Sequence, residues 1–191
     1  RIRSGLRYAL ADPERRAILA LLAALSVLAL PAMMLLPVYS EGVLHAGPRG
    51  LGLLSSAFAL GARAASVMLA RRALSEEMPL LVGRAAAAFG LAVAALAFLR
   101  GFAAAGAAMF AGGWAMMACF SGANIRLQDR SSDAMRGRVM GLFSMTFMST
   151  APLGALAMGW AGDRLGAPAA MAAGGLSCAA CGLVFLARLR W

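Results

Sequence analysis

Six apolar runs, each close to 20 residues long, leave this sequence little room for anything but membrane helices. The runs cover roughly 16–39, 50–70, 79–99, 102–125, 139–162 and 168–187. A helix of about 20 residues crosses the roughly 30 Å of hydrocarbon in a bilayer. A water-soluble fold of 191 residues could not hide an apolar fraction of 62%. The sequence therefore predicts an all-α, polytopic membrane protein with six transmembrane helices.

The gaps between the runs are short and rich in glycine, proline and charge. None of them is long enough to form a separate soluble domain. We therefore expect a cytoplasmic linker segment at 1–15 and a single six-helix bundle over 16–191.

All 18 basic residues are arginines, and they divide unevenly between the two ends of the predicted helices. One end carries 13 of them and the other carries Arg49, Arg100 and Arg164, whereas Arg63 and Arg84 lie within runs. Because arginine-rich connections stay in the cytoplasm, we expect both termini and the stretch 126–138 to be cytoplasmic. Arginines gathered in gaps, without interleaved aromatic residues, favour a lipid bilayer over a nucleic acid as partner.

A short repeat links the second and fifth runs. The second run contains GLLSSAF at 52–58 and the fifth contains GLFSMTF at 141–147, with four of seven positions identical. These two runs cross the membrane in opposite directions if the six helices alternate. The repeat therefore predicts two inverted three-helix units, an arrangement on which many membrane folds are built.

Three stretches resemble the C-terminal half of the major facilitator superfamily, in particular bacterial drug and siderophore exporters similar to the enterobactin exporter. GLRYALADPERRAIL at 5–19 resembles the central linker and seventh helix of that family. ANIRLQDRSSDAMRGRVMGLF at 123–143 resembles the connection between its tenth and eleventh helices. PLGALAMGWAGDRLGAP at 152–168 resembles the eleventh helix and the turn that follows it. The resemblance covers essentially the whole chain.

This resemblance implies half of a secondary-active transporter in the inner (plasma) membrane of a bacterium. The family works with two six-helix bundles that rock about a central site. The expected partners are therefore a second six-helix half, taken to be the N-terminal half of the same protein, and a small-molecule substrate, with protons as the candidate coupling ion. The implied activity is export of a drug or siderophore by alternating access, and no cofactor or metal is expected.

Two short motifs carry the resemblance at the level of single residues. The first lies in the connection before the fifth run and consists of Asp133, Arg136, Gly137 and Arg138. The second fits the superfamily signature G-x-x-x-D-R-x-G and consists of Gly159, Asp163, Arg164 and Gly166. After the fifth run, this signature favours a tight turn between helices over a gating latch.

Arg63 is the most informative single residue. It lies about eight residues, or roughly 12 Å, from the cytoplasmic end of the second run, where a charge costs about 2.5–3.5 kcal/mol. We expect it to face the bundle interior or a water-filled cavity. There it would contact an anionic substrate or a carboxylate of the other half. The alternative is that its side chain snorkels to the interface.

A polar stripe closes the fourth run. Ser121, Asn124 and Gln128 are spaced by three and four residues and share one helix face. Hydrogen bonding between helices is the favoured role for this stripe, and lining of a substrate pathway is the alternative.

Prolines interrupt two of the runs at Pro31, Pro37 and Pro152. Proline removes a backbone hydrogen bond and kinks a helix, so these positions could bend during rocking or could be static kinks.

An enzyme is not expected from this sequence. His45 is the sole histidine and lies in a gap, and the acidic residues all lie at the ends of runs. Cys178 and Cys181 have C-x-x-C spacing but lie in an apolar run, where they are small apolar residues rather than redox or zinc ligands. Two other functions stay open: a permease subunit of an ATP-driven transporter and a self-assembling six-helix channel.

Overall fold

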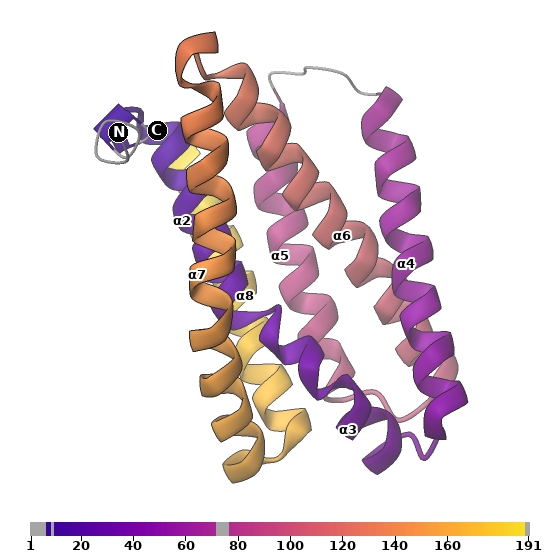
Figure 1. Cartoon of the computed structure of the whole chain (residues 1–191). Coiled ribbons are helices and arrows are strands. Elements are labelled where there is room, and N and C mark those ends of the chain that lie inside the picture. Colours follow the sequence, from indigo (N-terminus) through magenta and orange to yellow (C-terminus); the bar gives the residue numbers. More distant parts are fainter. Residues whose placement is uncertain (1–6, 9, 72–76, 190–191) are drawn as a thin grey trace.

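The structure is a computed structural model that describes residues 7–8, 10–71 and 77–189. Within these residues every regular element is a helix, and six segments are long and apolar enough to cross a membrane (Figure 1). The first segment comprises α2 (Pro13–Leu28), the 3₁₀ helix η1 (Pro31–Leu35) and α3 (Leu36–Gly42). The other five are α4 (Gly47–Arg71), α5 (Met78–Leu96), α6 (Phe102–Asp129), α7 (Asp133–Leu165) and α8 (Ala167–Leu189). The predicted six-span, all-helical fold is confirmed.

The helix ends differ most from the predicted ones between the fourth and fifth spans. α6 continues to Asp129 and α7 begins at Asp133, so the predicted connection 126–138 shrinks to residues 130–132. Apolarity marks where a helix meets lipid, whereas polar turns of the same helix continue into the headgroup region. For the same reason α2 begins inside the predicted linker 1–15.

α2 begins with a strong helix-start signal. Oδ1 of Asp12 accepts hydrogen bonds from the backbone N–H groups of Glu14, at 2.8 Å, and Arg15, at 3.2 Å. Pro13 fills the first helical position, and Glu14 brings negative charge to the positive end of the helix dipole. These features fix Glu14 and Arg15 at one end of the bundle.

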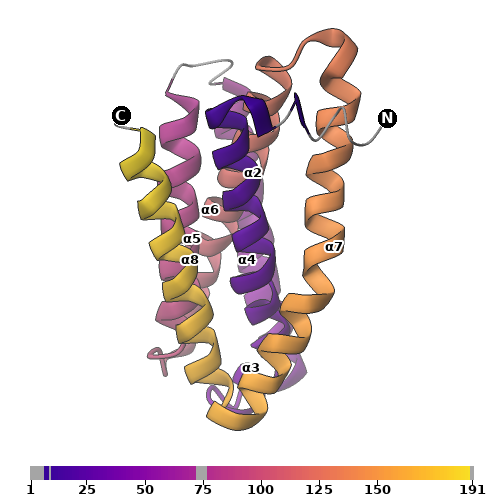
Figure 2. The same ribbon diagram turned by 90° about the vertical axis from the view of Figure 1, so that its left-hand side faces the viewer.

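The three prolines act differently on their helices. η1 begins at Pro31, and Pro37 lies in the first turn of α3, so the first span is broken at both positions. Pro152 lies inside α7, which continues through it. Because proline offers no N–H to the preceding turn, it weakens the helix there, and α7 changes direction partway along its length in Figure 2.

The helices form two layers joined along α5 and α8. In the first layer α6 lies between α4 and α5, and in the second layer α2 lies beside α7 and α8 (Figure 1). α4 packs against α6 in the first layer, and α7 packs against α2 in the equivalent way in the second. α4 and α7 run in opposite directions. Inverted three-helix units produce this pattern of contacts.

Glycines let the helices of the first layer approach until their backbones touch. A Cβ on Gly61 of α4 would overlap the carbonyl of Phe110, and a Cβ on Gly113 of α6 would overlap the carbonyl of Phe58. In a bilayer, where no hydrophobic effect drives helices together, close packing is a main source of association. The α4–α6 pair is therefore held by direct backbone contact where residues 58–61 cross residues 110–113.

The glycine contacts of α2 lie near one end of the helix. α5 and α8 approach closely where Gly90 faces Gly175. α2 meets its neighbours near its C-terminal end, where residues 27–28 face Gly154 of α7 and Gly174 of α8. Toward its N-terminal end α2 makes no such glycine contact with the described residues.

Apart from Arg63 and Arg84, which lie inside α4 and α5, the described arginines separate by end, as the sequence predicts. The end where α2 begins and α8 finishes carries Arg7, Arg15, Arg16, Arg71, Arg126, Arg130, Arg136, Arg138 and Arg188. The opposite end carries Arg49, Arg100 and Arg164. Four further arginines, Arg1, Arg3, Arg72 and Arg190, lie outside the described residues. We call the first of these ends the arginine-rich end.

Candidate functional site

At the arginine-rich end, a carboxylate from α2 holds two arginines of α6 and its C-terminal flank. Glu14 accepts a hydrogen bond from Nε of Arg126 at 2.6 Å and another from Nη2 of Arg130 at 2.6 Å. The side chains of Glu14 and Arg126 are 15% and 16% exposed, so this ion pair is largely shielded from water. It joins the start of the second-layer helix α2 to the end of the first-layer helix α6.

Arg15 and Tyr8 extend this junction to the α6–α7 connection. The buried guanidinium of Arg15 donates to the backbone carbonyl of Arg130 at 3.0 Å and to that of Tyr8 at 3.1 Å. It also lies 4.0 Å from the centre of the Tyr8 ring, a cation–π contact. The backbone N–H of Ser132 donates to the Tyr8 hydroxyl at 3.2 Å. We call the set Tyr8, Glu14, Arg15, Arg126, Arg130 and Ser132 the charged clasp.

The clasp changes the acidity of the Tyr8 hydroxyl. The hydrogen bond from the backbone N–H of Ser132, helped by the Ser132 side chain and by Arg15, lowers the pKa of Tyr8 to about 8. The physical cause is that N–H donors and a guanidinium stabilise the phenolate more than the neutral phenol.

The predicted loop motif lies beside the clasp, in the first turns of α7. Asp133 and Arg136 form an ion pair at 3.1 Å in which the Asp133 side chain is 92% exposed. Nη1 of Arg138 lies 3.5 Å from the sulfur of Met135, and a Cβ on Gly137 would meet open space. These residues therefore form a solvated helix surface.

Sequence reasoning missed Glu14 as the partner of Arg126 and Arg130. Asp129 does reach Arg126, at 3.5 Å, but Glu14 reaches both Arg126 and Arg130 at 2.6 Å. The run Asp12-Pro13-Glu14 is a helix-start signal that could have placed Glu14 at this end. Its pairing with α6 depends on tertiary contact, which no local pattern reports.

The polar stripe of α6 lies on one face, as its spacing predicts. Gln128 donates to the side-chain oxygen of Asn124 at 2.6 Å, and the Asn124 amide nitrogen lies 3.8 Å from the sulfur of Met140 on α7. Ser121 lies 3.6 Å from the sulfur of Met117. All three stripe residues are half-buried, and the Asn124–Met140 contact puts the stripe beside α7.

Arg63 lies on the side of α4 that faces away from α6. Gly61, which touches α6, is two residues away, which places Arg63 about 200° further around the helix. Its side chain is exposed, and no acidic side chain of the described residues pairs with it. Arg63 therefore does not face the bundle interior. The second expectation, that it faces a water-filled cavity, stays a prediction.

The signature at 159–166 forms the last turns of α7 and, at Gly166, the turn into α8. Gly166 follows the last residue of α7 with φ at 84°, a conformation that favours glycine, and its N–H donates to the carbonyl of Gly162 at 3.0 Å. The Arg164 guanidinium lies 5.5 Å from the ring centre of Trp160 on the same helix. Among the described residues, Asp163 forms no ion pair that would act as a latch.

The chain matches a known protein family. A family described as transmembrane secretion effector, of the major facilitator type, matches residues 1–190. No curated protein and no solved structure matches the chain.

Proposed function

The chain belongs to the transmembrane secretion effector family of major facilitator-type transporters, and from this premise we propose that it forms one six-helix half of a secondary-active exporter. The proposed mechanism is alternating access, in which two such halves rock about a site between them. The proposed cargo is a small molecule such as a drug or a siderophore, with protons as the coupling ion. The arginine excess at the end where α2 begins and α8 finishes supports placing that end in the cytoplasm of a bacterial cell.

The observation that carries this proposal is the uneven covering of the helices. Within the chain, 67% of the apolar span of α5 is buried, against 22% in α4 and 12% in α7. α4 lies at the edge of the first layer and α7 at the edge of the second (Figure 1). A second six-helix half placed against these two helices would cover both.

Arg63 supports a polar environment on the exposed side of α4. A guanidinium in contact with lipid tails costs about 2.5–3.5 kcal/mol or more near mid-membrane. Water in a transport pathway, or a carboxylate of a second half, would remove this cost. All eight acidic residues of the sequence lie near the ends of the predicted spans. We therefore infer that the proton-binding carboxylate belongs to the second half.

Two matched cysteine variants test what lies against the exposed side of α4. Leu60 lies one turn from Arg63 and is 60% exposed, and Leu176 lies near the middle of α8 and is 53% exposed. Each is replaced by cysteine in a background with C119A, C178A and C181A, and proteoliposomes are treated with a membrane-impermeant thiosulfonate. We expect L60C to react and L176C to stay unmodified. If both cysteines stay unmodified, the exposed side of α4 faces lipid and this part of the proposal is wrong.

Transport itself is tested with protein that is expressed from its own chromosomal locus and then purified. A second half produced in the same cell is then retained in the preparation. Proteoliposomes are loaded with ethidium or a catechol siderophore, and flux is followed under an imposed pH gradient or with ATP. We expect flux that follows the pH gradient, is lost in R63Q and is kept in R84Q, whose arginine lies near the arginine-rich end of α5. Flux that requires ATP would show instead a permease of the ATP-driven class.

A further inference from the structure

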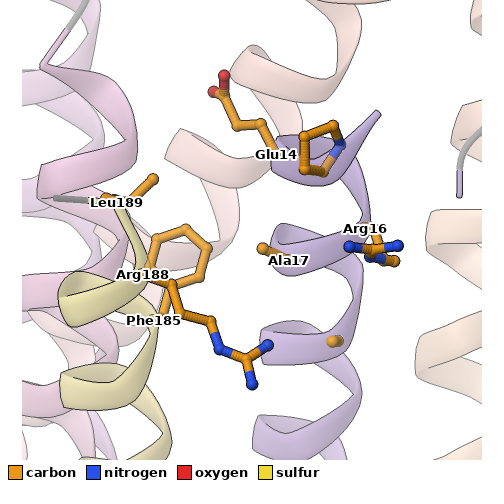
Figure 3. A pocket seen from close by; sticks show the side chains of 8 residues that line it. Glu14, Arg16, Ala17, Phe185, Arg188 and Leu189 are labelled. Atoms are coloured by element: carbon orange, nitrogen blue, oxygen red, sulfur yellow. The ribbon is translucent and has the colours of Figure 1, made fainter. Parts of the chain in front are cut away.

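A groove runs between α2 and α8 at the arginine-rich end. It consists of two adjoining cavities, one of about 700 Å³ and a deeper one of about 270 Å³, which share Ala17, Ala20, Phe185 and Arg188 in their walls. Figure 3 shows the residues that line the larger one. The groove is separate from the polar stripe of α6 and from Arg63, because neither contributes to its lining.

The groove exists because α2 and α8 touch at one level and separate above it. Leu28 of α2 meets Gly174 of α8 by close backbone contact. Nearer the arginine-rich end, α2 presents the small side chains Ala17 and Ala20, which are too short to fill the gap to Phe185. The corresponding pair in the first layer, α5 and α6, packs far more extensively.

Two arginines stand at the mouth of this groove. Arg16, in the first turns of α2, and Arg188, at the end of α8, line the upper cavity and are exposed. Neither forms an ion pair with an acidic group of the described residues. Glu14 also borders the cavity, but its carboxylate binds Arg126 and Arg130 and points away from the space between α2 and α8, into which Arg188 reaches (Figure 3).

The deeper cavity differs in chemistry from its mouth. Apart from Arg188, its lining consists of apolar or weakly polar side chains, and it adds Val184, Cys181 and Leu21 to the shared residues. A charged mouth at the level of helix ends above an apolar cleft matches the two parts of a phospholipid, because headgroups lie at helix ends and acyl chains lie deeper.

We propose that this groove binds one anionic phospholipid of the leaflet at the arginine-rich end. Its phosphate is held by Arg188, which reaches between α2 and α8, and by Arg16 on the adjoining face of α2 (Figure 3), and one acyl chain fills the cleft over Ala17, Ala20 and Cys181. Two cations without a carboxylate partner favour a headgroup with net negative charge over a zwitterionic one. The lipid supplies the contact with α8 that the N-terminal half of α2 lacks. This site is independent of any transported substrate.

The first test measures lipid binding to the delipidated, detergent-purified chain by native mass spectrometry. The probes are phosphatidylglycerol and phosphatidylcholine with the same acyl chains. We expect phosphatidylglycerol to bind at least tenfold more tightly than phosphatidylcholine, and R16Q/R188Q to weaken its binding about thirtyfold. The matched control is R71Q/R84Q, which removes the same charge from the same end outside the groove and should leave binding within about threefold of the original. Equal weakening by both double variants would show diffuse electrostatic attraction and overturn the proposal.

The second test leaves the arginines unchanged and measures whether a lipid occupies the deeper cavity. Cys181 is partly buried in the deeper cavity, whereas Cys119 and Cys178 are buried elsewhere in the core. We expect phosphatidylglycerol to slow modification of Cys181 by N-ethylmaleimide about tenfold, with C181S identifying the adduct. A20W, which fills the cleft but keeps both arginines, should abolish this lipid effect. Unchanged Cys181 modification, or equal protection by inorganic phosphate alone, would exclude an acyl chain in the cleft and overturn the proposal.

Discussion

The two layers of the bundle are related by the same pattern of contacts but are held together by different forces. In the first layer, α4 and α6 meet through backbone contact at Gly61 and Gly113. In the second layer, α2 meets α7 and α8 closely near its C-terminal end, beside the break at Pro31. Its other end is secured by the charged clasp. Similar topology thus does not imply similar cohesion, because cohesion in lipid depends on how closely the backbones approach.

This difference shows that glycine contacts and charged groups stabilise different parts of the bundle. Close packing is short-ranged and fails when a side chain intervenes, whereas the clasp joins groups that project beyond the apolar span. The second layer therefore combines one close crossing, one polar attachment and the groove between them. Each of these features can be perturbed separately.

The largest effect is expected where the first layer is tightest. G61L would push a side chain into the backbone of α6 around Phe110, and overpacking at such a contact costs about 3 kcal/mol. Unfolding in detergent can be followed by the fluorescence of Trp114, whose backbone lies beside Gly61. The matched control is G52L on the same helix, where a Cβ meets no other atom within 4 Å. Equal stability of the two variants would contradict backbone contact between α4 and α6.

A smaller loss is expected when the clasp is broken. E14Q removes the charge from two short hydrogen bonds and leaves the largely shielded Arg126 with only the more distant carboxylate of Asp129, at 3.5 Å, which costs about 2 kcal/mol. The measurement is the unfolding free energy in detergent at low salt. D133N also removes one carboxylate charge, but from an exposed ion pair, and should change stability by about 0.5 kcal/mol or less. If the charged clasp does not stabilise the fold, E14Q will change the unfolding free energy as little as D133N does.

At the opposite end, a hydrogen bond from Tyr39 ties the first span to the first layer. The buried Tyr39 of α3 donates its hydroxyl to the carbonyl of Leu99, in the connection between α5 and α6, at 2.8 Å. Y39F removes the donor and leaves this carbonyl unpaired, at a cost of about 1 kcal/mol. Denaturant titration in detergent should show a lower midpoint with an unchanged slope. A midpoint equal to that of the unmodified chain would mean that water replaces the hydroxyl.

The number and order of the helices could be predicted from sequence because they depend on local properties. Apolar length fixes the spans, arginine placement separates the two ends, and Pro31 and Pro37 mark the break in the first span. The turn at Gly166 also follows from local chemistry, because its positive φ favours glycine. Each of these features is decided within a few residues of chain.

The relations between helices could not be predicted in the same way. The pairing of Glu14 with Arg126 depends on how α2 packs against α6. The outward direction of Arg63 follows from the face of α4 that Gly61 turns toward α6. The groove arises because α2 separates from α8 on one side of the Leu28–Gly174 contact. A single sequence specifies which residues share a helix face but not which face is covered.

The smallest expected effect is the change in stability that accompanies the titration of Tyr8. The pH at which Tyr8 titrates also reports whether the charged clasp is formed. The folded chain holds the pKa of Tyr8 at about 8, below its ordinary value of 10.0, so the folded state releases this proton before the unfolded state does. The unfolding free energy should therefore rise between pH 8 and 10, and this contribution is lost as the pH falls through 8. Absorbance of tyrosinate near 295 nm should show a step of one tyrosine near pH 8 that Y8F removes. R15Q, which takes away the guanidinium stacked on the ring, should move the step upward, and a step at pH 10 in the unmodified chain would show an open clasp.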